Sequence, residues 1–121
     1  MKYYNQKQLY DGQVFDSKKE MYRYMDLKLL ENAGVISDLR TQVSFQLIPA
    51  QYEYFKRYGK NGKRLKDGKN CVEKAVVYKA DFVYKENGKE VVEDTKGLKT
   101  KDYIIKRKLM RYIHGIVIKE M

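Results

Sequence analysis

Two aspartates and a lysine are the residues of this chain whose types and spacing are best suited to chemistry. Asn87-Gly88 is typical of a two-residue type I′ turn, in which both central residues adopt positive φ. Pairing outward from that turn places Asp81 directly opposite Asp94. Because side chains alternate between the two faces of a strand, Lys96 projects from the same face as both aspartates.

Facing carboxylates need an explanation, because two like charges about 5 Å apart repel by roughly 3 kcal/mol at an effective dielectric constant near 20. A divalent cation between them would convert that repulsion into a binding site, since Mg²⁺ prefers oxygen ligands. Lys96 would bring a positive charge to the same place. A set of two acids and a lysine is suited to metal-assisted hydrolysis of phosphodiesters. The alternative is a hairpin whose charges form only a solvated face.

Composition predicts one domain, residues 1–121, with a partner that is a polyanion. The chain has 121 residues, enough for a sizeable core, and a net charge of +10 with a pI near 9.5. Such an excess of basic residues favours nucleic acid as the partner. The single cysteine, Cys71, excludes a disulfide framework and suits a reducing compartment. Without a signal peptide or an apolar stretch of about 20 residues, we expect a cytoplasmic protein with no membrane partner.

A first helix is predicted to begin at Ser17. Ser17 and Glu20 have the spacing of a capping box, in which each side chain bonds the backbone N–H of the other residue. Gly34 is a natural terminator. The helical spacing of apolar residues predicts a buried stripe of Met21, Met25 and Leu29, flanked by Tyr22, Leu30 and Ala33.

Four strands and a second helix complete the expected elements. Alternating apolar residues predict a strand over 42–48, ended by Pro49, and further strands lie near 72–85, 89–95 and 116–118. The second helix opens near Thr100 and runs to about Tyr112, with a core face of Tyr103, Ile105, Leu109 and Ile113. The order helix, three strands, helix, strand predicts an α/β fold with a central mixed sheet flanked by helices.

Residues 56–70 carry the most concentrated positive charge of the chain. Seven Lys or Arg, three glycines and two asparagines predict a flexible basic loop. Its basic residues are Lys56, Arg57, Lys60, Lys63, Arg64, Lys66 and Lys69, and aromatic residues precede or interleave with them. Such a segment could follow a phosphate backbone and stack on bases. The alternative is a long solvated hairpin tip.

The element order and two short motifs resemble the PD-(D/E)XK nuclease superfamily. The matching residues are Asp81 in KADFVY and Asp94-Thr95-Lys96 in VVEDTKG. From about Phe15 onward the chain is also similar to a small phage and prophage family catalogued as a domain of unknown function and placed near these nucleases. Two departures are Ala80, where proline often precedes the first aspartate, and Asp94, where glutamate is commoner. Strand alternation points the neighbouring Glu93 to the opposite face.

The resemblance implies a restriction-endonuclease-like αβββαβ core and a Mg²⁺- or Mn²⁺-dependent endonuclease acting on DNA in phage recombination, repair or replication. Asp81 and Asp94 would hold the metal, with the Thr95 carbonyl and Glu20 as further ligands. Lys96 would position the attacking water or stabilise charge developing in the transition state. Glu20 has two open roles, metal ligand and helix cap.

The resemblance also bears on substrate contacts and assembly. Lys99, Lys101 and the basic residues of 56–70 would contact phosphates and position the DNA without reading its sequence. A homodimer that cuts both strands is compatible with the size of the chain. Two other functions stay open, namely a catalytically silent nucleic-acid-binding module with a nuclease-like fold and an interaction protein that binds an acidic protein. His114, the only histidine, excludes a histidine-based triad or a zinc site.

Overall fold

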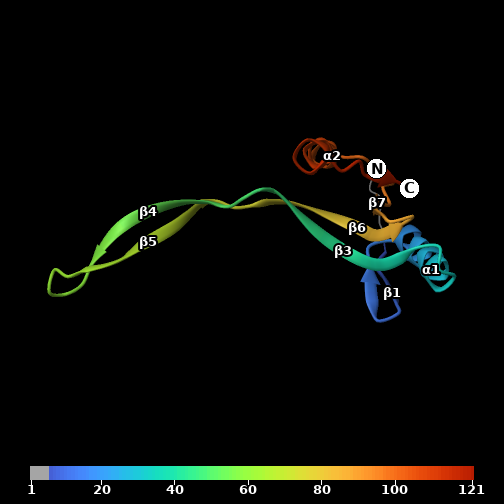
Figure 1. The fold of residues 1–121 in the computed structure, drawn as a ribbon, viewed down its shortest axis with the longest axis horizontal. Coiled ribbons are helices and arrows are strands. Elements are labelled where there is room, and N and C mark those ends of the chain that lie inside the picture. The colour runs from blue at the N-terminus through green and yellow to red at the C-terminus, as the bar shows by residue number, and fades with distance from the viewer. Residues whose placement is uncertain (1–5) are drawn as a thin grey trace.

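The computed structural model describes residues 6–121, within which the chain forms two helices and eight strands (Figure 1). The helices are α1 (Lys18–Asn32) and α2 (Lys101–His114). The strands are β1 (Gln8–Tyr10), β2 (Gln13–Phe15), β3 (Ser37–Ile48), β4 (Gln51–Tyr58), β5 (Arg64–Glu73), β6 (Val76–Glu86), β7 (Lys89–Asp94) and β8 (Lys119–Glu120).

Four strands form the central sheet in the order β3-β6-β7-β8, antiparallel except for the parallel pair β7–β8. Along the chain, the helices and central strands follow the order α1, β3, β6, β7, α2, β8. The predicted order of elements and the mixed sheet are therefore confirmed. The hairpins β1–β2 and β4–β5 each form a separate two-stranded sheet.

The turn between β6 and β7 sets the register that the sequence predicts. Asn87 and Gly88 have φ values of 53° and 74°. Beyond the turn, Phe82 lies opposite Glu93 and Val83 lies opposite Val92. Continuing this ladder by one pair brings Asp81 beside Asp94.

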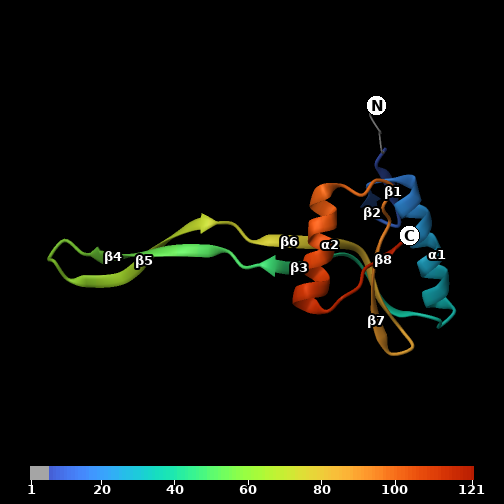
Figure 2. The same ribbon diagram turned by 90° about the horizontal axis from the view of Figure 1, so that it is seen from above.

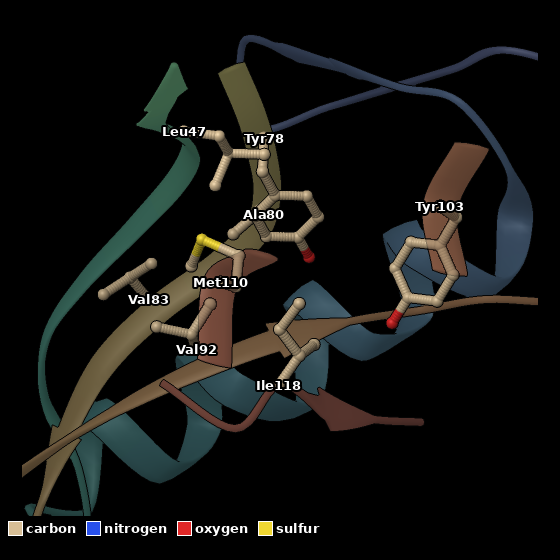
Figure 3. Packing of buried hydrophobic residues seen from close by; sticks show 8 residues of the cluster. All are labelled: Leu47, Tyr78, Ala80, Val83, Val92, Tyr103, Met110 and Ile118. Carbon is tan, nitrogen blue, oxygen red and sulfur yellow. The ribbon is translucent and has the colours of Figure 1, made fainter. Parts of the chain in front are cut away.

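The two helices cover opposite faces of the central sheet. Adjacent residues of β6 show this, because Val83 belongs to the core under α2 and Phe82 belongs to the core under α1. Figure 3 shows the first core, made of Leu47, Tyr78, Ala80, Val83, Val92, Tyr103, Met110 and Ile118. The second core is made of Phe15, Tyr24, Leu27, Ile36, Phe82 and Tyr84.

α1 buries a different face from the one that was predicted. Tyr24 and Leu27 are buried, whereas Tyr22 and Leu29 are 55% and 68% exposed. Glu20 is buried on the same face, one turn before Tyr24, so a search for apolar spacing misses the first position of this face. Of the other predicted core residues, Met21, Met25 and Leu30 are half-buried and Ala33 is exposed.

α2 begins where predicted and continues to His114, beyond the predicted end. Its buried face is centred on Tyr103 and Met110. These residues are about two turns apart, which directs Ile105 and Ile113 toward solvent. The prediction of Ile105 and Ile113 as core residues is therefore wrong, since both are exposed. Leu109 is half-buried and packs against the core, as predicted.

The bounds of three strands differ from the prediction. β6 covers Val76–Glu86 rather than 72–85, because residues 72–73 belong to β5. β3 begins at Ser37 rather than at residue 42, although it ends before Pro49 as expected. The last strand covers Lys119–Glu120 rather than 116–118. The side chain of Ile118 is buried in the core instead, so pairing with β7 starts only after it.

The predicted loop over 56–70 is wrong, because most of these residues belong to the hairpin β4–β5 (Figure 2). Its turn is closed by the Gly59 N–H, which donates to the Lys63 carbonyl at 2.8 Å. Glycine and asparagine suggested a break in regular structure, but the Phe55 ring packs across Gly68 and keeps that position in a strand. We call residues 51–73 the arm.

Within residues 6–121, neither helix combines the length and apolarity needed to cross a membrane. Cys71 is an exposed free thiol on the arm.

Candidate active site

A cleft of about 880 Å³ opens between the start of α1 and the segment that follows β7. Glu20, Asp81, Thr95 and Lys96 line it, so three of the four predicted catalytic residues face the same space. The fourth, Asp94, is buried behind this surface. The site is thus formed by the first turn of α1, the middle of β6 and the end of β7.

Thr95 holds Asp81 in place. Its backbone N–H and its Oγ1 donate to Oδ2 of Asp81, at 2.9 Å and 2.7 Å. A carboxylate oxygen with two donors has a fixed direction, which leaves the other oxygen of Asp81 for a different partner. The resemblance implied a ligand role for the Thr95 carbonyl, and the contacts with Asp81 are made by the N–H and hydroxyl of Thr95.

Asp94 is fully buried, with 0% of its surface exposed. Its Oδ2 accepts a hydrogen bond from the Tyr78 hydroxyl at 2.6 Å and lies 3.4 Å from the Lys96 ammonium. Its Oδ1 is buried and has no hydrogen-bond partner within residues 6–121. Buried polar atoms are almost always satisfied, so an orphaned carboxylate oxygen needs an explanation.

The environment of Asp94 also changes its affinity for a proton. Burial raises the pKa of Asp94 to about 7, and the Asp81 carboxyl beside it adds to the rise, because Asp94 can donate a hydrogen bond to Asp81 only in its protonated form. The Tyr78 hydroxyl and the positive charge of Lys96 act in the opposite direction. The predicted juxtaposition of the two aspartates is therefore present, and the Lys96 ammonium lies beside Asp94.

Lys96 lies between a carboxylate and an aromatic ring. Its ammonium is 3.4 Å from Asp94 Oδ2 and 4.8 Å from the centroid of the Tyr103 ring on α2. A cation over the face of an aromatic ring is attracted by the ring quadrupole. Both contacts hold the charge of Lys96 at the edge of the cleft, where it can act on a bound anion.

Glu20 lines the cleft from the other side and is 3% exposed. The capping box is present in part: the Glu20 N–H donates to Ser17 Oγ at 3.1 Å, but Glu20 Oε2 accepts from the Asp16 N–H at 3.3 Å rather than from that of Ser17. Glu20 Oε1 accepts from the Gln42 amide at 2.8 Å. Burial raises the pKa of Glu20 to about 7, and the nearby Asp81 carboxylate raises it further.

Gln42 marks the point where the sheet departs from regular alternation. It has a φ of 54°, which is uncommon for a residue with a side chain. The flanking pairs Thr41↔Phe82 and Val43↔Ala80 would place Gln42 opposite Asp81, but that pair is absent from the ladder. Strain of this kind clusters at functional sites.

Strand β6 changes face at the same point. Ala80 packs in the core under α2, whereas Phe82 packs in the core under α1, although strict alternation would place both on one face. The irregularity thus reorients β6 at the position of Asp81.

Glu93 faces away from the cleft, as the sequence predicted. Its carboxylate pairs with the Arg23 guanidinium on α1, through Nε and through Nη2 at 3.1 Å, and accepts from the Tyr84 hydroxyl at 2.7 Å. These contacts are part of the α1 side of the sheet, so Glu93 has a structural role.

The donor chemistry of the cleft fits a hard divalent cation. No three acidic, histidine or cysteine side chains within residues 6–121 are close enough to form a metal site by themselves, so Glu20 does not complete a cluster with the aspartates. Asp81 and Asp94 nonetheless form a pair with an orphaned oxygen. Mg²⁺ is often held by one or two carboxylates, with waters and substrate phosphates completing its shell. The pair satisfies that pattern.

The basic residues predicted to contact DNA lie outside the cleft. Lys99 pairs with Glu120 at 3.4 Å, and Lys101 is exposed at the first position of α2. The others, from Lys56 to Lys69, lie on the arm. Lys18 and Lys19 line the cleft itself and were not predicted.

Sequence reasoning missed three residues that support the site. Tyr78 and Tyr103 contact Asp94 and Lys96, and Gln42 contacts Glu20. Pattern analysis assigned Tyr103 to the core only, and the alternation of β6 gave no signal that Tyr78 would reach Asp94. Nothing in the sequence around Gln42 indicates a positive φ.

The chain matches the family described as Protein of unknown function (DUF1064) over residues 1–118 and belongs to that family. No curated protein and no solved structure matches the chain.

Proposed function

We propose that this DUF1064 protein is a metal-dependent endonuclease that hydrolyses phosphodiester bonds of DNA, built on a restriction-endonuclease-like core. The order α1-β3-β6-β7-α2-β8 and the motifs around Asp81 and Lys96 support this proposal. The net charge of +10 supports a polyanionic substrate.

The observation that carries the proposal is Oδ1 of Asp94, which lies beside Asp81 and has no hydrogen-bond partner in the part of the chain that the structure describes. A buried carboxylate that needs only stability would be fully hydrogen-bonded, and a second carboxylate next to it makes the arrangement costlier. A bound cation removes both costs. Asp81 and Asp94 would hold Mg²⁺ or Mn²⁺, with Glu20 and the Thr95 carbonyl as further candidate ligands. When bound, such an ion lowers the pKa of water and neutralises charge on a phosphate.

The other residues of the cleft would bind and orient the substrate. Lys96 presents a positive charge at the edge of the cleft, where it stabilises negative charge that develops on the phosphate. Thr95 keeps Asp81 in one orientation. Lys18 and Lys19 would contact phosphates of the strand being cut.

The test is cleavage of labelled duplex, single-stranded and four-way-junction DNA in the presence of Mg²⁺, Mn²⁺ or EDTA. Asp94→Asn and Lys96→Ala should abolish metal-dependent cutting. Asp26→Asn and Lys89→Ala are matched controls at exposed positions away from the cleft, and they should cut normally. Binding without cutting on every substrate, unchanged by the cleft variants, would contradict the proposal and support a silent DNA-binding module.

A further inference from the structure

The arm is a free-standing ribbon of two strands. It extends the β3–β6 ribbon far beyond the two helices (Figures 1 and 2). Every residue of β4 is exposed, and in β5 only Gly68 is less than exposed. Both faces of the ribbon therefore meet solvent, and the arm adds no side chain to either core.

The arm is held in shape by contacts between its own side chains, although an isolated hairpin is only marginally stable in water. The Phe55 ring covers Gly68 so closely that an added Cβ would lie 2.2 Å from it. The Lys69 ammonium lies 4.4 Å from the centre of the Tyr52 ring. These contacts order the strands and leave the other polar side chains available to a partner.

The charge of the arm favours a polyanion. Residues 51–73 include seven Lys or Arg against three acidic residues, Glu53, Asp67 and Glu73. Within this segment, Arg64 makes the one ion pair, with Asp67 at 2.7 Å. Lys60 and Lys63 flank the turn at the tip and are exposed. The other six basic side chains of the arm make no ion pair with residues 6–121, so the arm presents several free positive charges to a partner that carries many negative charges.

The dimensions of the arm match the major groove of B-form DNA. Two strands lie about 4.8 Å apart, and the major groove, about 12 Å wide, admits a two-stranded ribbon. At about 3.3 Å per residue, the chain reaches roughly 26 Å from Asp81 to the base of the arm and roughly 60 Å to its tip. At about 3.4 Å per base pair along the helix axis, these distances place the base and the tip of the arm within roughly 8 and 18 base pairs of the cleft. Because the groove winds once in roughly 10 base pairs, one part of a straight arm lies in it.

We propose that the arm enters the major groove of duplex DNA at a point between about 8 and 18 base pairs to one side of the bond that is cut. The proposal rests on the proposed nuclease function and specifies its substrate, which is a site flanked by B-form duplex on at least one side. An RNA duplex fits poorly, because its A-form major groove is too deep and narrow for side chains to read.

The first experiment measures binding of the full chain to duplexes of increasing length in EDTA, so that no cleavage enters the readout. Affinity should rise steeply until the duplex spans the cleft and the arm, and then level off. Lys60→Gln/Lys63→Gln should weaken binding to long duplexes about tenfold near 0.1 M salt and lower the salt slope by nearly 2. The same variant should bind short duplexes as the unaltered protein does.

The matched control is Lys85→Gln/Lys89→Gln, which removes the same charge from the exposed end of the β6–β7 hairpin. It should leave affinity and salt slope almost unchanged. An equal loss in both double variants, or no loss in either, would overturn the proposal. So would an RNA duplex bound as tightly as DNA and equally sensitive to the arm substitutions.

The alternative partner for the arm is a second copy of the chain. Light scattering decides this case, because a dimer that Lys60→Gln/Lys63→Gln dissociates would make the arm a contact between copies and overturn the DNA assignment. The cleavage test remains independent. Length-dependent binding through the arm without any cutting would refute the nuclease function alone. Cutting of duplex DNA with no effect of Lys60→Gln/Lys63→Gln on binding would refute only the placement of the arm in the major groove.

Discussion

At the scale of single residues, the site depends on a carboxylate placed where a negative charge is unfavourable. Asp94 has no exposed surface and Asp81 lies next to it, and one Asp94 oxygen has no hydrogen-bond partner among the described residues. Folding therefore places an unfavourable charge at the position where a cation would be bound. A substitution that removes the charge of Asp94 should therefore raise stability and lower activity.

Asp94→Asn should stabilise the protein at alkaline pH. Because the pKa of Asp94 is raised to about 7 in the folded protein, its stabilising effect is complete below about pH 4 and is lost as the pH rises through 7. Asparagine does not titrate. Without metal, the free energy of unfolding of the variant should exceed that of the unaltered protein by about 4 kcal/mol at pH 8, with little difference at pH 4. Urea denaturation at both pH values measures this, and an equal difference at both would contradict it.

Millimolar Mg²⁺ should raise the melting temperature of the unaltered protein at pH 8 and leave that of Asp94→Asn unchanged. The reason is that a ligand stabilises the folded state only when it binds there. Differential scanning fluorimetry with and without EDTA checks this prediction. A matching shift in the variant would place the metal elsewhere.

Thr95→Val should lower cleavage about tenfold with little loss of stability. The substitution removes the hydroxyl that donates to Asp81 but keeps the backbone N–H bond. Thr95→Ser keeps the hydroxyl and should restore most of the rate. Single-turnover cleavage rates, measured over a Mg²⁺ titration, compare the two variants. Equal rates for both would exclude a role of the Thr95 hydroxyl in positioning Asp81.

At the scale of elements, the sequence correctly predicted the features that depend on interactions between residues close to one another in the chain. The Asn87-Gly88 turn sets a register that the structure confirms, because turn geometry and pairing are short-range. Helix starts were predicted from Ser17 and Thr100 for the same reason. The buried faces of both helices were partly wrong, because they depend on how each helix meets the sheet.

The irregularity at Gln42 could not be predicted, since neither its positive φ nor the change of face in β6 has a sequence signature. The arm was predicted as a flexible loop, with a long solvated hairpin tip as the alternative, and the structure has the hairpin. Glycine normally weakens a strand, and only the packing of Phe55 on Gly68 explains why this one persists.

Gly88→Ala should destabilise the protein by about 1 kcal/mol. Gly88 has a φ of 74°, which an alanine adopts only with strain, and the turn it forms sets the β6–β7 register. Gly97→Ala is the control, since an added Cβ there meets nothing within 4 Å and its φ is not in the left-handed region. Chemical denaturation of both variants measures the difference. Equal stability would mean that the turn does not constrain the hairpin.

At the scale of the whole molecule, the arm and the rest of the chain have different roles, since one provides reach and the other stability. We call residues 6–50 and 74–121 the body. Both cores lie in the body, and the arm contributes to neither. Replacing residues 51–73 by a short turn between β3 and β6 should therefore leave the melting temperature within a few degrees of its original value. Circular dichroism follows the unfolding, and a chain that no longer melts cooperatively would show that the arm supports the fold.

Because the arm packs against neither core, the distance from the cleft to the tip of the arm can change without changing the rest of the fold. Short links, residues 49–50 and 74–75, join the arm to the central sheet, so its length can change without disturbing a packed residue. Inserting two residues in each strand would preserve the facing of every side chain and lengthen the ribbon by about 7 Å, or roughly two base pairs. A single-residue insertion would instead rotate the outer half onto the opposite face. Length variation in this protein should consequently occur in steps of two.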